Sequence, residues 1–259
     1  MHKLRNFYGL YRIYDSVGRR WLQHGTTIHG HQYIEGEKVD QPLGYYHAST
    51  PVGQVLLDNK LLIKEVGMSG LGTGALCSYF KLDQKFTVFE LDADNIDIAK
   101  ENFSFLSNAK ERGANISLVV GDGRLCLKDV KNNKFDLFIL DAFNSGSIPV
   151  HLLTIEAISE YLRVLKFEGV LLMHISNKIL DLLPVIARAG KDLNVYLLEK
   201  NNRGNLEKDA EETYWVVLSR SKKRVKRLID VHTWNLIDTA YIQRRLWTDQ
   251  YTNIFDAFY

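Results

Sequence analysis

The stretch that decides the fold is residues 61–74, which read LLIKEVGMSGLGTG. Leu61 to Gly67 is a run of apolar and branched residues that is typical of a buried strand. Gly70, Gly72 and Gly74 follow it, and an apolar stretch with helical spacing comes next. Glycines at such a junction let the backbone turn tightly and bring the N–H groups of the helix start close to a ligand. The stretch therefore predicts a strand, a ligand-binding glycine loop and a helix.

Further strand candidates follow this loop, separated by stretches with helical spacing. They predict strands at residues 86–90, 116–120, 135–140, 169–175, 193–198 and 214–218. Strands that alternate with helices favour a parallel sheet covered on both faces. The last two candidates are close in the sequence, so we expect an antiparallel finish at one edge. The fold class predicted for residues 56–259 is α/β, a doubly wound, mostly parallel seven-stranded sheet of Rossmann type with a C-terminal helical extension.

Residues 1–55 have a different texture and predict a small N-terminal domain of β-hairpins. Leu10–Tyr14 and Arg19–Gln23 are rich in aromatic and branched residues, and the turn signal DSVG lies between them. A second hairpin is expected around Gly30 and Gly36.

The composition excludes several classes of protein. The 259 residues include 33 Lys and Arg against 31 Asp and Glu, a balance that gives no strong field for nucleic acid or a membrane surface. Cys77 and Cys126 are too few for a disulfide framework and suit a reducing compartment. No apolar run has the length of a spanning helix, and the N-terminus lacks the apolar core of a secretory signal. We therefore expect a cytoplasmic protein that binds neither nucleic acid nor membrane.

Acidic residues stand at the ends of three further strand candidates, where doubly wound sheets bind their ligands. Glu90 lies 20 residues after Gly70, and a carboxylate there can accept hydrogen bonds from both ribose hydroxyls. Asp122-Gly123 follows the third strand and could bind the exocyclic amine of adenine. Asp141 follows four apolar residues and could take a proton. The spacing G-x-G-x-G, rather than G-x-G-x-x-G, favours an S-adenosyl nucleoside over a dinucleotide.

These features also have purely structural interpretations. Asp122 between glycines can be a turn signature, and Asp141 can be a helix N-cap or an ion-pair partner. His29 and His31 could share a strand face as metal ligands, but no nearby Cys or acid completes a zinc pattern, so we expect no metal. Ser69 lacks the G-x-S-x-G spacing of a nucleophile elbow, which disfavours a serine hydrolase.

The order of the glycine loop, Glu90, Asp122-Gly123 and Asp141 resembles that of class I S-adenosylmethionine-dependent methyltransferase folds. Three features narrow the resemblance to the spermidine synthase (polyamine aminopropyltransferase) family. They are Gln32, Tyr45-Tyr46-His47, and the polar loop that Asp141 opens and that reaches Pro149. The segments HGTTIHGHQY, YYHASTPVG, GLGTG, GDGR, DAFNSGSIPVHLLT and HISN most resemble a bacterial branch of spermidine synthase-like proteins. The resemblance runs over nearly the whole chain.

The resemblance implies a role for each matching residue. The residues that would hold the nucleoside are Gln32, Gly70, Gly72, Gly74, Glu90, Asp122 and Gly123. Asp141 would position and deprotonate the attacking amine, and Tyr46, His47 and Asn144 would line the channel for that amine. The resemblance further implies decarboxylated S-adenosylmethionine as co-substrate, or S-adenosylmethionine itself, with a small-molecule amine as acceptor, no metal, and a homodimer.

Three positions depart from the family's pattern by lacking an acid. The family's glycine loop usually has an Asp that binds the aminopropyl ammonium, where this chain has Gly72. A second Asp usually follows the catalytic one, where this chain has Asn144, and Ala48 stands where a Glu usually follows Tyr-His. Each lost charge contact costs on the order of 1 to 3 kcal/mol, which argues against a long polyamine as acceptor.

Three functions remain open on the sequence. The first is spermidine synthase-like aminopropyl transfer to an amine such as putrescine, with release of methylthioadenosine. The second is methyl transfer from S-adenosylmethionine to a small molecule. The third is a non-catalytic nucleoside-binding homologue.

Overall fold

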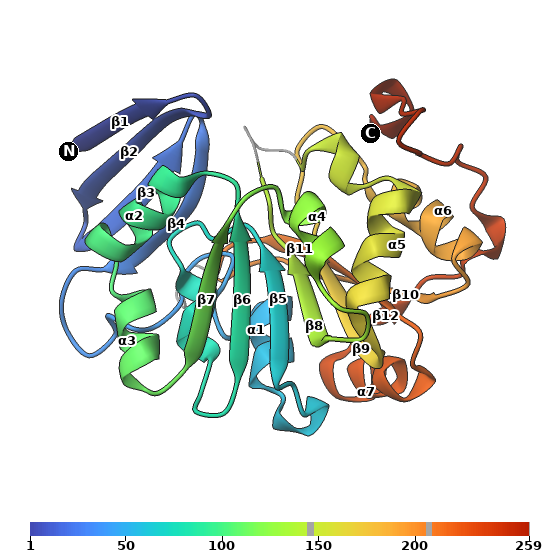
Figure 1. The fold of residues 1–259 in the computed structure, drawn as a ribbon, viewed down its shortest axis with the longest axis horizontal. Coiled ribbons are helices and arrows are strands. Elements are labelled where there is room, and N and C mark those ends of the chain that lie inside the picture. The colour runs from blue at the N-terminus through green and yellow to red at the C-terminus, as the bar shows by residue number, and fades with distance from the viewer. Residues whose placement is uncertain (144–147, 206–208, 259) are drawn as a thin grey trace.

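The computed structural model describes residues 1–143, 148–205 and 209–258. Within these residues an eight-stranded sheet forms the centre of the molecule, in the order β12-β10-β11-β9-β8-β5-β6-β7 (Figure 1). Its strands are β5 (Glu65–Ser69), β6 (Lys85–Glu90), β7 (Asn115–Val120), β8 (Phe135–Leu140), β9 (Leu165–His174), β10 (Tyr196–Asn202), β11 (Thr213–Ser219) and β12 (Asn235–Leu236). The seven strands predicted from the sequence are present, and the two-residue β12 extends the sheet by one.

The direction of the pairing confirms a mostly parallel sheet. The neighbours from β7 through β6, β5 and β8 to β9 are parallel, whereas β11 pairs antiparallel with β9, and β10 pairs antiparallel with β11 and β12. Strand β5 lies between β6 and β8, so the strand order reverses there. In doubly wound sheets a ligand binds at the carboxyl ends of the strands beside such a switch point.

The first strand of this sheet begins later than the sequence indicated. The expected strand at residues 61–67 is wrong in its first half, because Asn59–Leu61 forms a 3-10 helix and Leu62 adopts a left-handed conformation with φ 49°. The strand begins at Glu65, where the carboxylate of Asp136 accepts hydrogen bonds from the backbone N–H groups of Lys64 and Glu65 at 3.0 and 2.9 Å.

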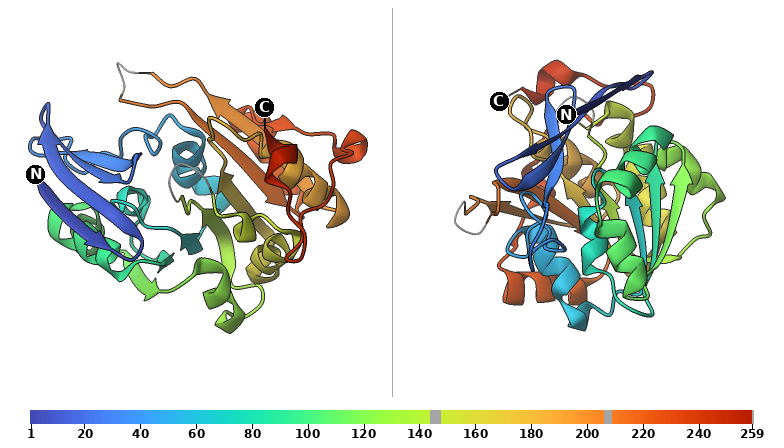
Figure 2. Two further views of the ribbon diagram at one scale, coloured as in Figure 1. Left: turned by 90° about the horizontal axis from the view of Figure 1, so that it is seen from above. Right: turned by 90° about the vertical axis from the view of Figure 1, so that its left-hand side faces the viewer.

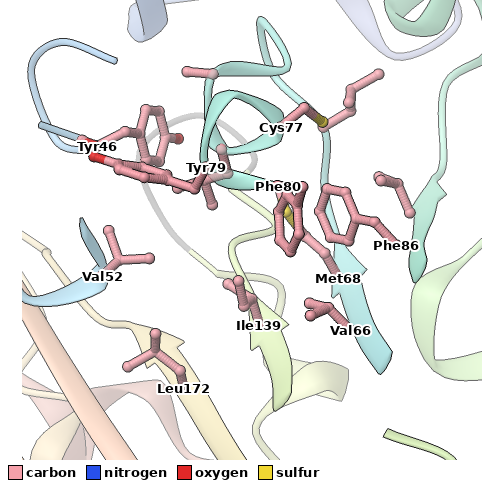
Figure 3. Close-up of a cluster of buried hydrophobic side chains, with 14 of the residues drawn as sticks. Tyr46, Val52, Val66, Met68, Cys77, Tyr79, Phe80, Phe86, Ile139 and Leu172 are labelled. Atoms are coloured by element: carbon pink, nitrogen blue, oxygen red, sulfur yellow. Dashed lines mark hydrogen bonds between the residues drawn. The ribbon is translucent and has the colours of Figure 1, made fainter. Parts of the chain in front are cut away.

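Helices cover both faces of the sheet, and the side chains of each strand alternate between two cores. Leu137 and Ile139 of β8 point into one core, while Phe138 and Leu140 point into the other. Figure 3 shows part of the first core, where Val66 and Met68 of β5 lie near Ile139, Phe80 and Phe86. The helices are α1 (Pro51–Leu57), α2 (Ala93–Asn102), α3 (Phe105–Glu111), α4 (Gly123–Cys126), α5 (Ile155–Val164), α6 (Leu183–Asp192) and α7 (Lys222–His232), with 3-10 turns η1 (Asn59–Leu61), η2 (Ala75–Tyr79), η3 (Leu127–Asp129), η4 (Val150–Leu152), η6 (Thr239–Tyr241) and η7 (Ile254–Ala257).

A second sheet of four antiparallel strands, all within the described residues, is built from the N-terminal segment in the order β1-β2-β3-β4. The strands are β1 (His2–Asn6), β2 (Gly9–Ser16), β3 (Arg19–His24) and β4 (Thr27–Tyr33). The predicted hairpin is confirmed, because Ser16 pairs with Arg19 across a two-residue turn in which Val17 and Gly18 both have positive φ. The second hairpin expected around Gly30 and Gly36 is wrong. Gly30 lies in β4, which pairs with β3, and Gly36 lies in a turn.

The N-terminal sheet packs beside α2 and α3, as two views of the ribbon show (Figure 2). Gln32 of β4 makes hydrogen bonds to Ser104 ahead of α3, and Arg20 of β3 donates to the carbonyl oxygen of Asn102 at the end of α2. The N-terminal sheet therefore meets the helices that follow β6, next to the carboxyl ends of the parallel strands.

No helix in residues 1–143, 148–205 and 209–258 is long and apolar enough to cross a membrane.

Candidate functional site

The glycine loop between β5 and η2 is a tight backbone turn. Gly70, Gly72 and Gly74 all have positive φ, at 94°, 56° and 82°. A Cβ at Gly70 would lie 2.3 Å from the carbonyl oxygen of Asp141, and one at Gly72 would lie 2.9 Å from the carbonyl oxygen of His29. Only glycine fits these positions, because both the conformation and the space exclude a side chain. The helix expected after the loop is the 3-10 turn η2.

Glu90 closes the far side of this loop from the end of β6. One carboxylate oxygen accepts hydrogen bonds from the Leu71 N–H at 2.8 Å and the Asn95 amide at 3.1 Å, and the other accepts from the Asp92 N–H at 3.0 Å. Burial raises the pKa of Glu90, although these hydrogen bonds partly oppose the rise. Each carboxylate oxygen can accept more than one hydrogen bond, so Glu90 can still receive ribose hydroxyls.

Asp122 and Gly123 stand at the end of β7 and start α4. One carboxylate oxygen of Asp122 caps α4 by accepting from the Leu125 N–H at 2.9 Å, and the other lies 3.0 Å from Nε2 of His151. A Cβ at Gly123 would lie 2.1 Å from the Ser69 hydroxyl oxygen, so α4 packs directly on the end of β5. This packing brings the ends of β5 and β7 to one pocket.

Asp141 follows β8 and is almost fully buried. Its carboxylate lies 2.8 Å from Nδ1 of His174, at the end of β9, and interacts electrostatically with the hydroxyl of Tyr46. Burial and then the Asp141 charge raise the pKa of Tyr46 well above its ordinary value, so this hydroxyl keeps its proton at neutral pH. The Tyr79 hydroxyl in turn donates to the carbonyl oxygen of Tyr46 at 2.5 Å (Figure 3).

One pocket collects most of the residues predicted to bind the nucleoside and to act on the amine. The predicted residues that line it are Gly70, Gly72, Glu90, Asp122, Gly123 and Asp141. Tyr8, Tyr11, His24 and His29 of the N-terminal segment cover it. The structure thus brings four strand ends and the N-terminal sheet to one place.

Other predicted residues lie apart from the pocket lining. Gln32 turns its amide inward, where it accepts from the Ser104 N–H at 3.0 Å and donates to the Val39 carbonyl oxygen at 2.9 Å. Gly74 caps η2 behind the loop. The His47 ring lies 2.9 Å from the Ser49 hydroxyl oxygen.

Tyr46 and Asn144 were also predicted to contact the substrate. Tyr46 reaches the site through its electrostatic interaction with Asp141, and Asn144 lies outside the described residues. The substrate-binding roles of Tyr46, His47 and Asn144, and the nucleoside contact of Gln32, remain predictions.

Sequence reasoning missed the residues that attach the N-terminal sheet to the pocket. The Tyr11 hydroxyl donates to Asp92 at 2.8 Å, and the Asn6 amide donates to Asp92 and Asp94, each at 2.7 Å. The signal that could have found Asp92 is its place two residues after Glu90, where it caps α2. Because Tyr11 and Asp92 both line the pocket, this contact holds the N-terminal sheet over the pocket.

His29 is a second residue that sequence reasoning assigned no role in this site. Its Nε2 is buried and has no hydrogen-bond partner in the part of the chain that the structure describes. Burial, followed by the nearby His24, lowers the pKa of His29 to about 4, so its ring is neutral at pH 7. No three His, Cys, Asp or Glu side chains of the described residues come together as a group that could hold a metal ion.

The charges of the pocket all have one sign. Glu90, Asp92, Asp122 and Asp141 line it, and the described lining residues include no Lys or Arg. A cleft that carries carboxylates alone favours a cationic ligand and repels an anionic one. The fold and the site therefore define a doubly wound α/β protein whose pocket suits a positively charged group.

Comparisons with known proteins place this chain in a family. Residues 62–195, slightly over half of the chain, match the family model described as the spermine/spermidine synthase domain. The chain therefore belongs to the spermine/spermidine synthase family. A polyamine aminopropyltransferase of Vibrio vulnificus (strain CMCP6) is 30% identical over 108 residues, which are 41% of this chain and 34% of that protein. The match thus spans about a third of the relative's length.

Solved structures share the fold over almost the whole chain. A probable spermidine synthase from Corynebacterium glutamicum ATCC 13032 superimposes with a TM-score of 0.68 at 12% identity, covering 97% of both chains. Spermidine synthase from Thermotoga maritima gives a TM-score of 0.64 at 15% identity, covering 96% of this chain and 80% of the other. At such identities the likeness shows the fold alone, including the small N-terminal sheet beside the larger one.

Proposed function

We propose that this chain transfers an aminopropyl group from decarboxylated S-adenosylmethionine to a small primary amine and releases methylthioadenosine. The observation that carries the proposal is the charge of the pocket, four carboxylates with no Lys or Arg among its described lining residues. The decarboxylated donor ends in an ammonium group, whereas S-adenosylmethionine also carries a carboxylate. Placing like charges together costs several kcal/mol, so the pocket favours the donor without the carboxylate.

The nucleoside part of the donor is assigned to the strand ends beside the switch point. Exposed backbone of the glycine loop approaches the ligand closely, Glu90 accepts the ribose hydroxyls, and Asp122 lies where the adenine amine would donate. Tyr11, held by Asp92, covers the ligand from the N-terminal sheet. Family membership and the shared fold support this assignment.

The chemistry needs an unprotonated amine behind the reacting carbon. Asp141 takes a proton from the acceptor's ammonium group, and the freed nitrogen lone pair attacks the carbon next to the sulfonium. The new C–N bond forms as the C–S bond breaks, and its electron pair stays on sulfur to give the neutral thioether of methylthioadenosine. The product nitrogen then carries the positive charge. The protein contributes alignment and general-base catalysis, because the sulfonium is already a good leaving group.

The acceptor side holds one carboxylate that the sequence comparison with the family did not anticipate. Glu211, which lies just before β11, interacts electrostatically with Tyr45. The ring of Tyr45 in turn lies 5.7 Å from that of His174. Burial and then Glu211 raise the pKa of Tyr45, so this phenol stays neutral. Glu211 can therefore attract a second ammonium group of the acceptor, which partly replaces the acids missing at Ala48 and Gly72 and favours a diamine.

The test is calorimetric titration with methylthioadenosine, S-adenosylmethionine and the decarboxylated donor in parallel. The proposal predicts that all nucleosides compete for one site and that the decarboxylated donor binds at least tenfold more tightly than S-adenosylmethionine. A preference for S-adenosylmethionine would contradict the proposal and favour methyl transfer. If none of the three nucleosides bound, the proposed function would be refuted, and only the fold and the family membership would stand.

A further inference from the structure

A buried pair joins the ends of β8 and β9 behind the pocket. His174 Nδ1 lies 2.8 Å from a carboxylate oxygen of Asp141, and the two side chains are 4% and 2% exposed. The His174 ring stacks on Trp215 of β11, with the ring centres 4.4 Å apart and the planes 6° from parallel. The Phe143 ring also meets the His174 ring in a T-shaped arrangement, with 4.8 Å between the ring centres. The stacking on Trp215 and the contact with Phe143 therefore restrain the orientation of the imidazole.

The hydrogen bonds on the other ring nitrogen indicate which tautomer the imidazole adopts. Nε2 of His174 lies 2.8 Å from the Ser176 hydroxyl oxygen and 3.0 Å from the Thr213 hydroxyl oxygen. The Ser176 oxygen already accepts the backbone N–H of Tyr214 at 2.8 Å, so its own proton is available to Nε2. Nε2 then acts as the acceptor, and Nδ1 carries the proton that points at Asp141.

Asp141 thus meets two polar side chains from different parts of the chain. His174 approaches from the end of β9, and the Tyr46 hydroxyl approaches from the segment between the two sheets. The directed His174 donor restrains the plane of the carboxylate, which lies beside the Tyr46 hydroxyl, and the remaining carboxylate lone pairs are left to face the pocket. The other ionisable groups that face this pair are His29, Tyr45 and, through the tyrosines, Glu211.

We propose that His174 is a positioning residue for the transfer reaction, and that it fixes the Asp141 carboxylate in the orientation from which it takes the acceptor's proton. This inference rests on the proposed function. It assigns a catalytic purpose to the segment HISN, which sequence reasoning used only as a mark of resemblance. Misplacement of a catalytic group by about 1 Å can lower a rate on the order of a hundredfold, so loss of His174 should act on turnover rather than on nucleoside binding.

The kinetic test compares three variants with the unaltered chain. His174→Phe keeps a flat ring against Trp215 but removes the donor, and should lower kcat about a hundredfold while the Kd for methylthioadenosine stays within twofold. His174→Asn restores an N–H near the Nδ1 position and should recover at least a tenth of the original kcat. His2→Asn, on the exposed β1, is the matched control and should leave kcat unchanged. A His174→Phe variant that keeps full kcat would overturn the role of His174 while leaving the proposed function intact.

A second measurement does not depend on turnover. Nitrogen NMR of histidine-labelled protein should show His174 protonated at Nδ1 and unprotonated at Nε2 near pH 7. The opposite tautomer would overturn the arrangement, even in an active enzyme. If the unaltered chain turned over none of the amines with the decarboxylated donor, the proposed function would fail, and the positioning role of His174 with it.

Discussion

Replacing Glu90 by Gln tests the nucleoside site with the smallest change of shape. The Glu90 carboxylate accepts three hydrogen bonds, from Leu71 and Asn95 on one oxygen and from Asp92 on the other. A glutamine can keep its oxygen toward Leu71 and Asn95, but its NH₂ group then faces the N–H of Asp92. The variant therefore loses one internal hydrogen bond and the negative charge that ribose hydroxyls would meet.

The expected loss of affinity follows from these contacts. A hydrogen bond to a charged group contributes about 1.5 to 3 kcal/mol, and a neutral one about half of that. Two ribose hydroxyls that lose the charged acceptor together account for about 2 kcal/mol, which corresponds to a Kd roughly 30-fold weaker. Because burial raises the pKa of Glu90, the carboxylate takes up a proton at a higher pH than an ordinary glutamate. As the pH is lowered, affinity in the unaltered chain should therefore begin to fall at a higher pH than an ordinary glutamate would give, and this dependence should be absent in the variant.

The assay is calorimetric titration of methylthioadenosine into the unaltered chain, Glu90→Gln and the matched control Glu101→Gln. Glu101 lies exposed on the same helix that follows β6, α2, so its variant should bind with unchanged Kd. Thermal unfolding of the ligand-free proteins shows whether the fold survives each change. A Glu90→Gln Kd within threefold of the original, at equal thermal stability, would mean that the ribose lies elsewhere.

Three further predictions test other parts of the structure. Asp141→Asn should lower kcat at least a hundredfold while the Kd for methylthioadenosine stays within twofold, and a fully active variant would refute the general-base role. Gly72→Ala should weaken nucleoside binding about tenfold, because the backbone φ at this position is 56° and the new Cβ would meet the His29 carbonyl oxygen. An unchanged Kd would show that the loop has room to relax. Burial alone would raise the pKa of Asp58, but hydrogen bonds, chiefly from Arg227, lower it to about 2. The stability that this carboxylate contributes is therefore present above about pH 4 and is lost toward pH 2, so the difference in Tm between the unaltered chain and Asp58→Asn should shrink across that interval.

Local patterns along the chain were enough to predict the frame of the site. The glycine loop after the first strand, Glu90 after the second, Asp122 after the third and Asp141 after the fourth each follow an apolar strand. Because parallel strands bring their carboxyl ends to one edge of the sheet, these residues were expected to lie close together. The structure collects Gly70, Glu90, Asp122 and Asp141 in one pocket, as expected.

Local sequence patterns could not predict the side-chain contacts that complete the site, because these contacts join segments far apart in the sequence. Asp141 and His174 are 33 residues apart, and Tyr11 lies 81 residues from the Asp92 carboxylate that it contacts. No periodicity or spacing links such pairs. The prediction also failed locally at Leu62. This residue belongs to an apolar run that suggested a strand, but its backbone adopts a left-handed conformation before β5.

The most direct test of the account is turnover by the purified chain with decarboxylated S-adenosylmethionine and a short diamine such as putrescine. Chromatography measures methylthioadenosine, and mass spectrometry measures the aminopropylated amine. The account predicts that both products form in equal amounts, and that Asp141→Asn forms neither above background. Formation of a methylated amine and S-adenosylhomocysteine from S-adenosylmethionine, with no methylthioadenosine from the decarboxylated donor, would contradict it.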